Sequence, residues 1–316
     1  TKTIVTVGEM LVEFISHDRN CALEKISDYS GPYPSGAPAI FLDQVARMGA
    51  PTEMIGGVGD DGFGLSVLNR LKEDGVGTDG VTVSPNLSTG VAFVSYYDSG
   101  DRDFIFHLAG TAADAFDVPL SLLDPKNTFL HVSASSLGAA SMRDKIMEVV
   151  RSVSDGGGLI SCDPNARTEL MIDPATREAM HDVMERSYCL LPSTSDLEFL
   201  YPDLSEDAAI DKLLNAKAEI VTIKRGAAGA TVVGYGERHD FPGHTVEEID
   251  PTGAGDCFCG TFVSLLAQGA SLFEAGQRAN VAGAIAVTRR GPMEGNSTLS
   301  EITTFLSNMT SKEFSA

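Results

Sequence analysis

The chain has 316 residues, 43% of them hydrophobic and 21% charged, which is enough for a large core arranged as one large or two unequal lobes. Its 44 acidic residues outnumber 23 Lys and Arg, and the formal net charge of −21 would repel nucleic acid and anionic bilayers. No apolar run approaches the roughly 20 residues of a membrane helix, and the first residues resemble a strand rather than a signal peptide. We therefore expect a cytoplasmic protein with no nucleic-acid partner and no membrane partner.

Short β-branched runs alternate with helical patterns along most of the chain, which is typical of an α/β fold with a mostly parallel central sheet. Within one helical pattern, apolar residues recur on a single face and are expected to pack on the core: Met142, Ile146, Val149, Val150 and Val153. The predicted strands, in chain order, are Thr3 to Val7, Glu53 to Val58, Thr128 to Val132, Leu159 to Asp163, Tyr188 to Leu191 and Ile220 to Lys224.

One segment interrupts this alternation. Residues 91–97 and 102–107 are strand-like and are joined by Asp98-Ser99-Gly100-Asp101, which predicts a hairpin. Together with residues around 10–35, this hairpin would form a small β sheet outside the main body, placed to cover a binding cleft.

The densest chemical signal is Asp250-Pro251-Thr252-Gly253-Ala254-Gly255-Asp256, followed by an apolar helical run. Small residues at a helix start leave backbone N–H groups open to an oxyanion or a phosphate. Asp256 has two interpretations there: it is a helix cap, or it takes a proton from a substrate hydroxyl beside the phosphate.

These residues resemble the signature of the ribokinase-like carbohydrate kinases, the PfkB family. The resemblance continues at Ser35 to Ala39, at Val45 to Gly49 and at Gly57 to Gly64. It implies one ribokinase-like kinase domain over residues 1–316, a large α/β domain with a mostly parallel sheet, and a small β-sheet lid formed by about 10–35 and 88–110. It also implies ATP-dependent phosphorylation of a sugar hydroxyl. Asp256 would be the general base, and the backbone amides of Gly253, Ala254 and Gly255 would stabilise the transferring phosphoryl group.

The resemblance also suggests where ATP and its ions bind. Lys224, Gly226 and Gly229 match the strand and glycine turn beside the nucleotide, although a plain β turn is an alternative. Asn280 and Gly283 match a helix lining the adenine site, with a packing face as the alternative. Mg²⁺ would accompany ATP, and in relatives a potassium ion lies near the positions of Asp250 and Thr252.

On the sugar side, Glu13 occupies a position where relatives have an acidic residue that binds hydroxyls; otherwise it is a solvated lid residue. Gly36 and Ala37 belong to the glycine motif beside the sugar. Arg167, in Asp163-Pro164-Asn165-Ala166-Arg167, would lie near a phosphate or an anionic substrate group, or would form a structural ion pair.

Two positions depart from the family pattern. Relatives have Asn and, three residues later, Glu near the magnesium-bound phosphates, where this chain has Ser193 and Asp196. Asp196 keeps the charge on a shorter stem and could still hold water around Mg²⁺. Ile40 replaces an Asn that contacts sugar in many relatives, so one polar contact is missing.

The acceptor follows from the resemblance. Gly8 to Glu13 and Ser35 to Ala39 look like the motifs of ketohexose kinases, so a tagatose or fructose kinase ranks first. A 2-keto-3-deoxygluconate kinase ranks second, because Phe106-His107-Leu108 lacks the arginine that would face an acid. A catalytically silent sugar-binding regulator on the same fold is the alternative from another class. Relatives often pair through their lids, and Tyr96, Tyr97 and Phe104 are expected to be exposed there, so we expect a homodimer.

A second glycine pattern, Gly57-Val58-Gly59-Asp60-Asp61-Gly62, has the GxGxxG spacing of a dinucleotide-binding motif. Two carboxylates would then face a pyrophosphate, which disfavours a nicotinamide oxidoreductase.

Overall fold

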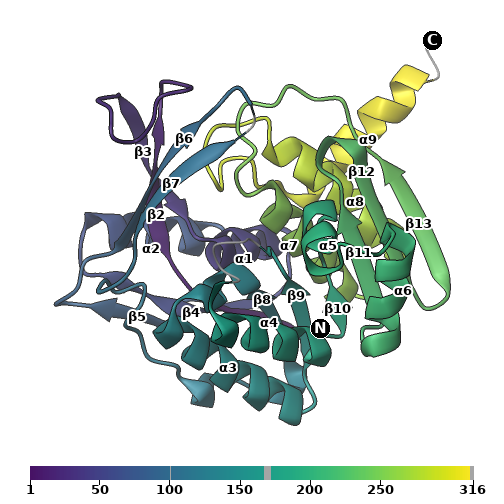
Figure 1. Ribbon diagram of the computed structural model, residues 1–316, viewed down its shortest axis with the longest axis horizontal. Helices are drawn as coiled ribbons and strands as arrows, with labels where there is room; N and C mark the ends of the chain where they lie inside the picture. Colours follow the sequence, from purple (N-terminus) through teal and green to yellow (C-terminus); the bar gives the residue numbers. More distant parts are fainter. Residues whose placement is uncertain (100, 167–171, 314–316) are drawn as a thin grey trace.

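The structure, a computed structural model, describes residues 1–99, 101–166 and 172–313. Within these ranges a large sheet of nine strands has the order β13-β12-β11-β10-β9-β8-β1-β4-β5 (Figure 1). Its strands pair in parallel except at β11-β12 and β12-β13, which are antiparallel. Their bounds are β1 Thr3–Val7, β4 Thr52–Gly59, β5 Val81–Ser84, β8 Thr128–Ser133, β9 Leu159–Asp163, β10 Cys189–Leu190, β11 Ile220–Lys224, β12 Gly229–Gly234 and β13 Glu237–Pro242.

Helices cover both faces of this sheet because successive strand residues point to opposite sides and both sides are apolar. Ile4 belongs to one hydrophobic core and Val5, the next residue of β1, to the other. The first core includes residues of α1, α7 and α8, and the second includes residues of α3, α4 and α6. The helices are α1 Ala37–Arg47, α2 Gly62–Glu73, α3 Ala140–Asp155, α4 Pro174–Arg186, α5 Thr194–Leu200, α6 Glu206–Ala216, α7 Ala254–Ala267, α8 Leu272–Ala286 and α9 Leu299–Glu313.

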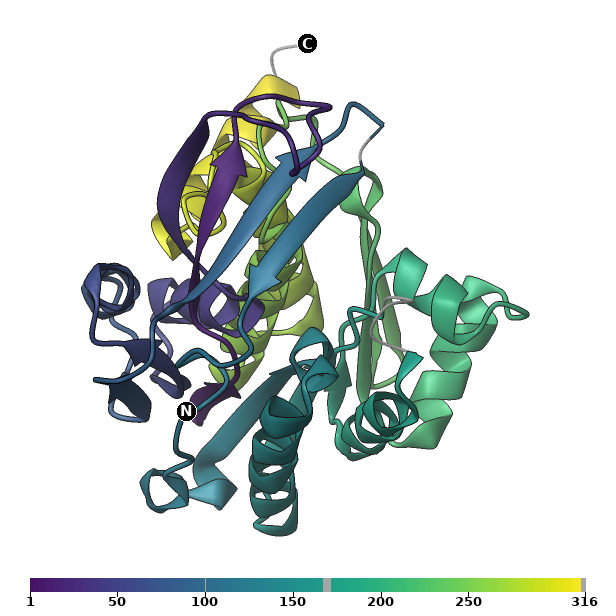
Figure 2. The same cartoon turned by 60° about the vertical axis from the view of Figure 1, so that its left-hand side comes forward.

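A second sheet lies apart from the large one. Its four strands have the order β3-β2-β6-β7, and Figure 2 shows them in purple and blue as a layer separate from the teal and green strands. Strands β6 (Gly90–Tyr96) and β7 (Arg102–His107) form an antiparallel hairpin, and β2 (Leu11–Ser16) pairs with both β3 (Tyr29–Ser35) and β6. The expected hairpin and second sheet are therefore confirmed, whereas closure of this sheet over a ligand stays a prediction.

The strands predicted from sequence are present, most of them within one residue of the expected bounds. Strand β10 is shorter than expected, covering Cys189–Leu190. The apolar stripe of α3 is buried at every expected position. Strands β5, β12 and β13 were not predicted; the outer strand β13 (Glu237–Pro242) carries Glu237, Arg238 and Asp240, so it lacks an apolar run.

The expectation that Tyr96 is exposed is wrong. Tyr96 is only 8% exposed, because its side chain lies against the large domain, where its hydroxyl bonds Asp250. Tyr97 and Phe104 are half-buried. The homodimer that these aromatic residues suggested stays a prediction.

The second glycine pattern forms a helix start. Asp61 is the N-cap of α2, and its carboxylate accepts hydrogen bonds from the Gly64 N–H at 2.8 Å and from the Thr89 N–H at 2.8 Å. A carboxylate held in this way caps the helix, in agreement with the rejection of a pyrophosphate site. Among the helices of the described ranges, none is long and apolar enough to cross a membrane.

Candidate active site

The glycine-rich motif forms the start of α7. Gly253 is the N-cap in the left-handed region at φ 78°, and a Cβ there would lie 2.4 Å from the carbonyl oxygen of Pro292, so both conformation and space require glycine. Ala254, Gly255 and Asp256 are the first three helical residues. N–H groups in the first turn of a helix lack intrahelical acceptors and carry the positive end of the helix dipole. The turn therefore favours an anion.

This turn opens into a cavity of about 690 Å³. The cavity lies at the carboxyl ends of β9 and β11, where parallel α/β sheets usually bind ligands. The residues predicted from sequence that line it are Asp196, Lys224, Gly226, Gly229, Gly253, Ala254, Gly255, Asp256, Asn280 and Gly283. The fold thus brings together residues that are up to 87 positions apart, since the set runs from 196 to 283.

Other predicted residues lie elsewhere. Glu13, Gly36, Ala37, Asp250 and Thr252 do not line this cavity. Arg167 lies outside the described residues, so its predicted role stays a prediction.

Asp256 is half-buried and lies one turn or less from the positive end of α7. Because Gly253 is the N-cap and Asp256 is the third residue of the helix, the cap position itself is not occupied by Asp256. Its carboxylate lines the same cavity as the first-turn residues Ala254 and Gly255. A carboxylate and the N-terminal turn of a helix thus line one cavity, which is compatible with phosphoryl transfer to a hydroxyl.

Lys224 forms an ion pair with Asp163 in which the two side chains are only 13% and 7% exposed. Burial alone would lower the pKa of Lys224, but the charges of Asp163, Cys259 and Asp196 and the hydrogen bond to Asp163 together outweigh burial and raise it, so the lysine stays protonated. Its Nζ also lies 3.5 Å from the Cys259 Sγ. A Cβ on Gly255 would lie 3.7 Å from this Nζ, so the ammonium group is close to the anion-binding turn.

The departure at Ser193 and Asp196 has a structural explanation. The two residues form a capping box at the start of α5: Asp196 Oδ2 accepts from the Ser193 N–H at 2.6 Å, and Ser193 Oγ accepts from the Asp196 N–H at 3.2 Å. Asp196 Oδ1 accepts from the Ala166 N–H at 2.6 Å. The carboxylate is therefore held rigidly in the cavity wall.

The remaining predicted nucleotide contacts are also structural. Gly229 has φ 102°, and a Cβ there would lie 2.0 Å from the carbonyl oxygen of Phe241. The amide of Asn280 donates to the Pro242 carbonyl at 2.8 Å, and Gly283 faces Ala254 on α7, where a Cβ would lie 3.6 Å from its carbonyl oxygen. The packing alternative for Asn280 and Gly283 thus accounts for part of their role, and both still line the cavity.

On the second sheet, Glu13 is buried with 3% exposure, so the solvated alternative is wrong; the neighbouring strands cover it. Ser35 Oγ donates to its Oε2 at 3.2 Å, while Oε1 has no hydrogen-bond partner among the described residues. Burial, and next the charge of Asp250, raise the pKa of Glu13 to about 7. An unpartnered buried carboxylate oxygen is suited to accept a ligand hydroxyl.

Sequence reasoning missed three contributors to the cavity or its edge. Arg102 lines the cavity from β7, Asp163 pairs with Lys224, and Tyr96 bonds Asp250. Arg102 and Tyr96 lie in the hairpin that the strand-like runs predicted, but the sequence did not show which face of that hairpin packs on the large domain. The Asp163 pair joins two strand ends, and a parallel sheet places such ends together.

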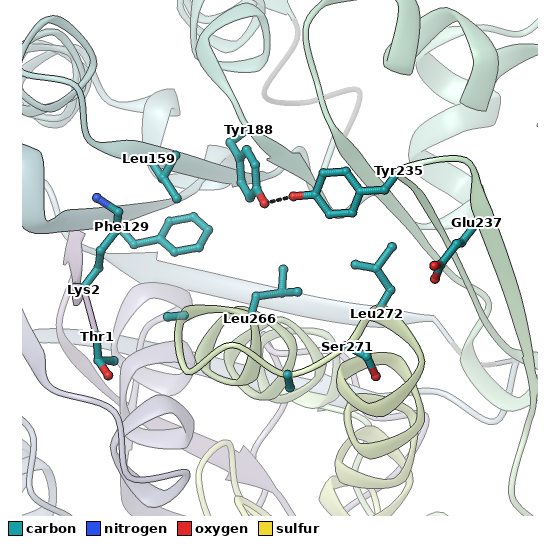
Figure 3. A pocket seen from close by; sticks show the side chains of 12 residues that line it. Thr1, Lys2, Phe129, Leu159, Tyr188, Tyr235, Glu237, Leu266, Ser271 and Leu272 are labelled. Atoms are coloured by element: carbon teal, nitrogen blue, oxygen red, sulfur yellow. Dashed lines mark hydrogen bonds between the residues drawn. The ribbon is translucent and has the colours of Figure 1, made fainter.

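A further cavity of about 540 Å³ lies at the other end of the large sheet (Figure 3). Its walls are mixed, with Phe129, Leu159, Leu266 and Leu272 beside Thr1, Lys2, Glu237 and Ser271. The hydroxyls of Tyr188 and Tyr235, which also line it, bond each other. None of the predicted site residues lines it. The predicted nucleotide-binding residues and Asp256 instead line the cavity beside α7.

Comparisons with known proteins agree with this geometry. A family model described as pfkB family carbohydrate kinase matches residues 1–299. Fructokinase-1 of Oryza sativa subsp. japonica is 30% identical over 305 residues, which cover 92% of this chain and 93% of the rice protein. Two solved structures of an E. coli protein described as a ribokinase II, an apo form and a complex with ATP and Mg²⁺, each share 41% identity. Each has a TM-score of 0.91 and an alignment covering 98% of this chain and 100% of the other.

The expected ribokinase-like fold and the ATP-dependent sugar kinase class are therefore confirmed. This chain belongs to the pfkB family of carbohydrate kinases.

Proposed function

We propose that the protein transfers the γ-phosphoryl group of ATP to a hydroxyl of a ketohexose, with fructose as the first candidate and tagatose as the second. The observation that carries this proposal is that Asp256 lines the same cavity as the first-turn residues of α7. Fructose ranks first because relatives that are 30% identical to this chain are named fructokinases, one of them as probable.

In this mechanism Asp256 accepts the proton of the attacking sugar hydroxyl as the oxygen–phosphorus bond forms and the bond to ADP breaks. The amides of Gly253, Ala254 and Gly255 stabilise the charge on the transferring group. Lys224 adds a fixed positive charge near Gly255, held in place by Asp163. Little further chemistry is needed, because phosphoryl transfer depends mostly on position and charge.

The residues present fit Mg²⁺ that arrives with ATP. Asp163 lines the cavity, and its Oδ1 has no hydrogen-bond partner in the part of the chain that the structure describes. Asp196 lines the same wall. These two carboxylates would hold magnesium-bound water, and the bound ion would neutralise phosphate charge. The similar E. coli protein has a solved structure in complex with ATP and Mg²⁺. No set of three or more potential metal ligands is found in the described ranges.

On the sugar side, Glu13 would accept hydroxyl hydrogens through its unpartnered Oε1. Gly36 and Ala37, at the start of α1, would border the same region, and the second sheet would act as a lid that keeps water from the phosphate. The monovalent cation near Asp250 and Thr252 stays a prediction.

The test is ADP release with ATP and Mg²⁺ across fructose, tagatose, ribose, glucose and 2-keto-3-deoxygluconate. We expect the highest kcat/KM with a ketohexose. Release only with the keto acid would replace the ketohexose by the second-ranked acceptor. Tight sugar binding without ADP release would contradict the kinase and favour the regulator.

A further inference from the structure

A side chain of the second sheet reaches the loop that carries the anion-binding turn. Tyr96, the last residue of β6, donates its hydroxyl proton to Asp250 Oδ1 at 2.6 Å. The same hydroxyl shares a hydrogen bond with Thr252 Oγ1, and because its own proton faces Asp250, the Thr252 hydroxyl is the donor there. Burial, and next the charge of Asp250, raise the pKa of Tyr96, so its hydroxyl remains a donor.

The partners of Tyr96 are themselves fixed. Asp250 is 1% exposed, and its carboxylate also accepts the Thr252 N–H at 3.0 Å and the Gly291 N–H at 2.9 Å. Thr252 immediately precedes Gly253, whose Cα lies against Pro292. The loop before α7 is thus held by residues 291–292 on one side and by Tyr96 of the second sheet on another.

The strand register extends this contact into the cavity. Tyr96 is paired directly with Arg102 across the β6-β7 hairpin, and paired residues project from the same face of a sheet. Arg102 lines the cavity that contains Asp256, while Tyr96 lies against the large domain. The strand register therefore links the backbone position of Arg102 to that of Tyr96.

The cavity is lined by more acidic than basic side chains, so the position of Arg102 affects how it would accept a polyphosphate. Four carboxylates line it, those of Asp163, Asp196, Glu248 and Asp256. Among the described lining residues, the Lys and Arg side chains are Lys224, which is paired with Asp163, and Arg102, which has no ion pair within the described ranges. A polyphosphate entering this acidic cavity needs such a cation.

We propose that Tyr96 is a positioning residue for phosphoryl transfer. Its hydroxyl joins the second sheet to the loop before α7, and this contact holds Arg102 at the cavity and the sheet against the large domain. The inference rests on the proposed kinase function, since its effect on turnover requires the reaction at α7. Positioning of this kind acts on turnover more than on folding, because the chemical groups remain present while their geometry loosens.

The test compares Tyr96→Phe with Tyr97→Phe. The control removes a neighbouring hydroxyl of the same strand end, which bonds Asp103 Oδ2 at 2.6 Å on the exposed side of the sheet. We expect Tyr96→Phe to lower kcat by about tenfold or more, with the control within about twofold of the unaltered protein. Equal kcat in the two variants, or a loss of thermal stability in Tyr96→Phe with unchanged kcat, would overturn the inference.

Two further measurements separate this inference from the proposed function. Hydrogen exchange in β2 (Leu11–Ser16) and in the β6-β7 hairpin should be faster in Tyr96→Phe than in Tyr97→Phe, whether or not the unaltered protein phosphorylates a sugar. Equal hydrogen-exchange rates in the two variants would show that Tyr96 does not hold the second sheet to the loop before α7. Absence of ADP release by the unaltered protein would contradict the proposed function alone. In an active enzyme, the effects of Tyr96→Phe and Asp250→Asn on kcat should be non-additive, because the two groups share one hydrogen bond; additive effects would also overturn the inference.

Discussion

The buried carboxyl group of Glu13 should make the stability of this protein depend on pH. Burial, and next Asp250, raise its pKa from the ordinary 4.5 to about 7. The folded protein therefore keeps a proton on Glu13 between these two values, while the unfolded chain releases it. Because the folded state binds more protons in this window, the associated stability is complete below pH 4.5 and is lost as pH rises through 7.

The magnitude follows from the linkage relation. A pKa of about 7 in place of 4.5 corresponds to a total of about 3 kcal/mol, of which about 2.5 kcal/mol falls between pH 5 and pH 8. Glu13→Gln removes this titration, and the glutamine carbonyl can still accept the hydrogen bond from Ser35. Relative to the unaltered protein, the variant should therefore become more stable by about 2.5 kcal/mol as pH rises from 5 to 8.

The assay is urea unfolding of both proteins at pH 5, 6, 7 and 8, without ligands. Other groups that titrate in this range are common to both proteins, so they cancel in the difference between the two free energies of unfolding. A difference that stays constant from pH 5 to pH 8 would refute the reasoning, because it would show that Glu13 ionises equally in the folded and unfolded chains.

Three other outcomes are expected. Gly255→Ala should fold normally, since the added Cβ meets only the Lys224 Nζ at 3.7 Å. The added methyl group should nevertheless raise the KM for ATP by about tenfold, because it takes up space at the turn where the phosphates would bind. An unchanged KM for ATP would contradict phosphate binding at this turn. Lys224→Met should lower the free energy of unfolding by about 3 to 5 kcal/mol, because Asp163 would stay buried without its partner. The double variant Lys224→Met/Asp163→Asn should regain part of that free energy. Urea unfolding of both variants measures the two changes. The KM for fructose should fall as pH rises from 6 to 8 in the unaltered enzyme as Glu13 ionises, and should stay flat in Glu13→Gln; parallel profiles would exclude Glu13 as the sugar contact.

The sequence was informative where local pattern determines structure. The strands around Ile4, Phe129 and Ile160 are apolar on both faces because helices cover both sides of a parallel sheet, so their runs were visible. The turn at Gly253 was visible for a different reason, since a positive φ and a nearby carbonyl oxygen leave glycine as the residue that fits.

What the sequence could not show depends on contacts between distant segments. Tyr96 looked like an exposed lid residue, because alternation along β6 separates two faces without showing which one meets the large domain. Asp250 lies 154 residues beyond it, and the hydrogen bond between them exists only once the second sheet packs on the loop before α7. Asp196 was recognised as a carboxylate near the phosphates, but its capping box with Ser193 and its bond to Ala166 appear only in the folded α5.

Proton transfer from the sugar hydroxyl to Asp256 is the step on which the proposed mechanism depends. The most direct measurement is ADP release by the unaltered enzyme, Asp256→Asn and Glu248→Gln, each with saturating ATP, Mg²⁺ and the preferred sugar. Glu248 is a matched control because its carboxylate lines the same cavity and it precedes α7 in the chain rather than belonging to its first turn. We predict that Asp256→Asn lowers kcat by about 10²- to 10⁴-fold while sugar binding persists, with Glu248→Gln within about fivefold of the unaltered enzyme. A kcat for Asp256→Asn close to that of Glu248→Gln would contradict the mechanism.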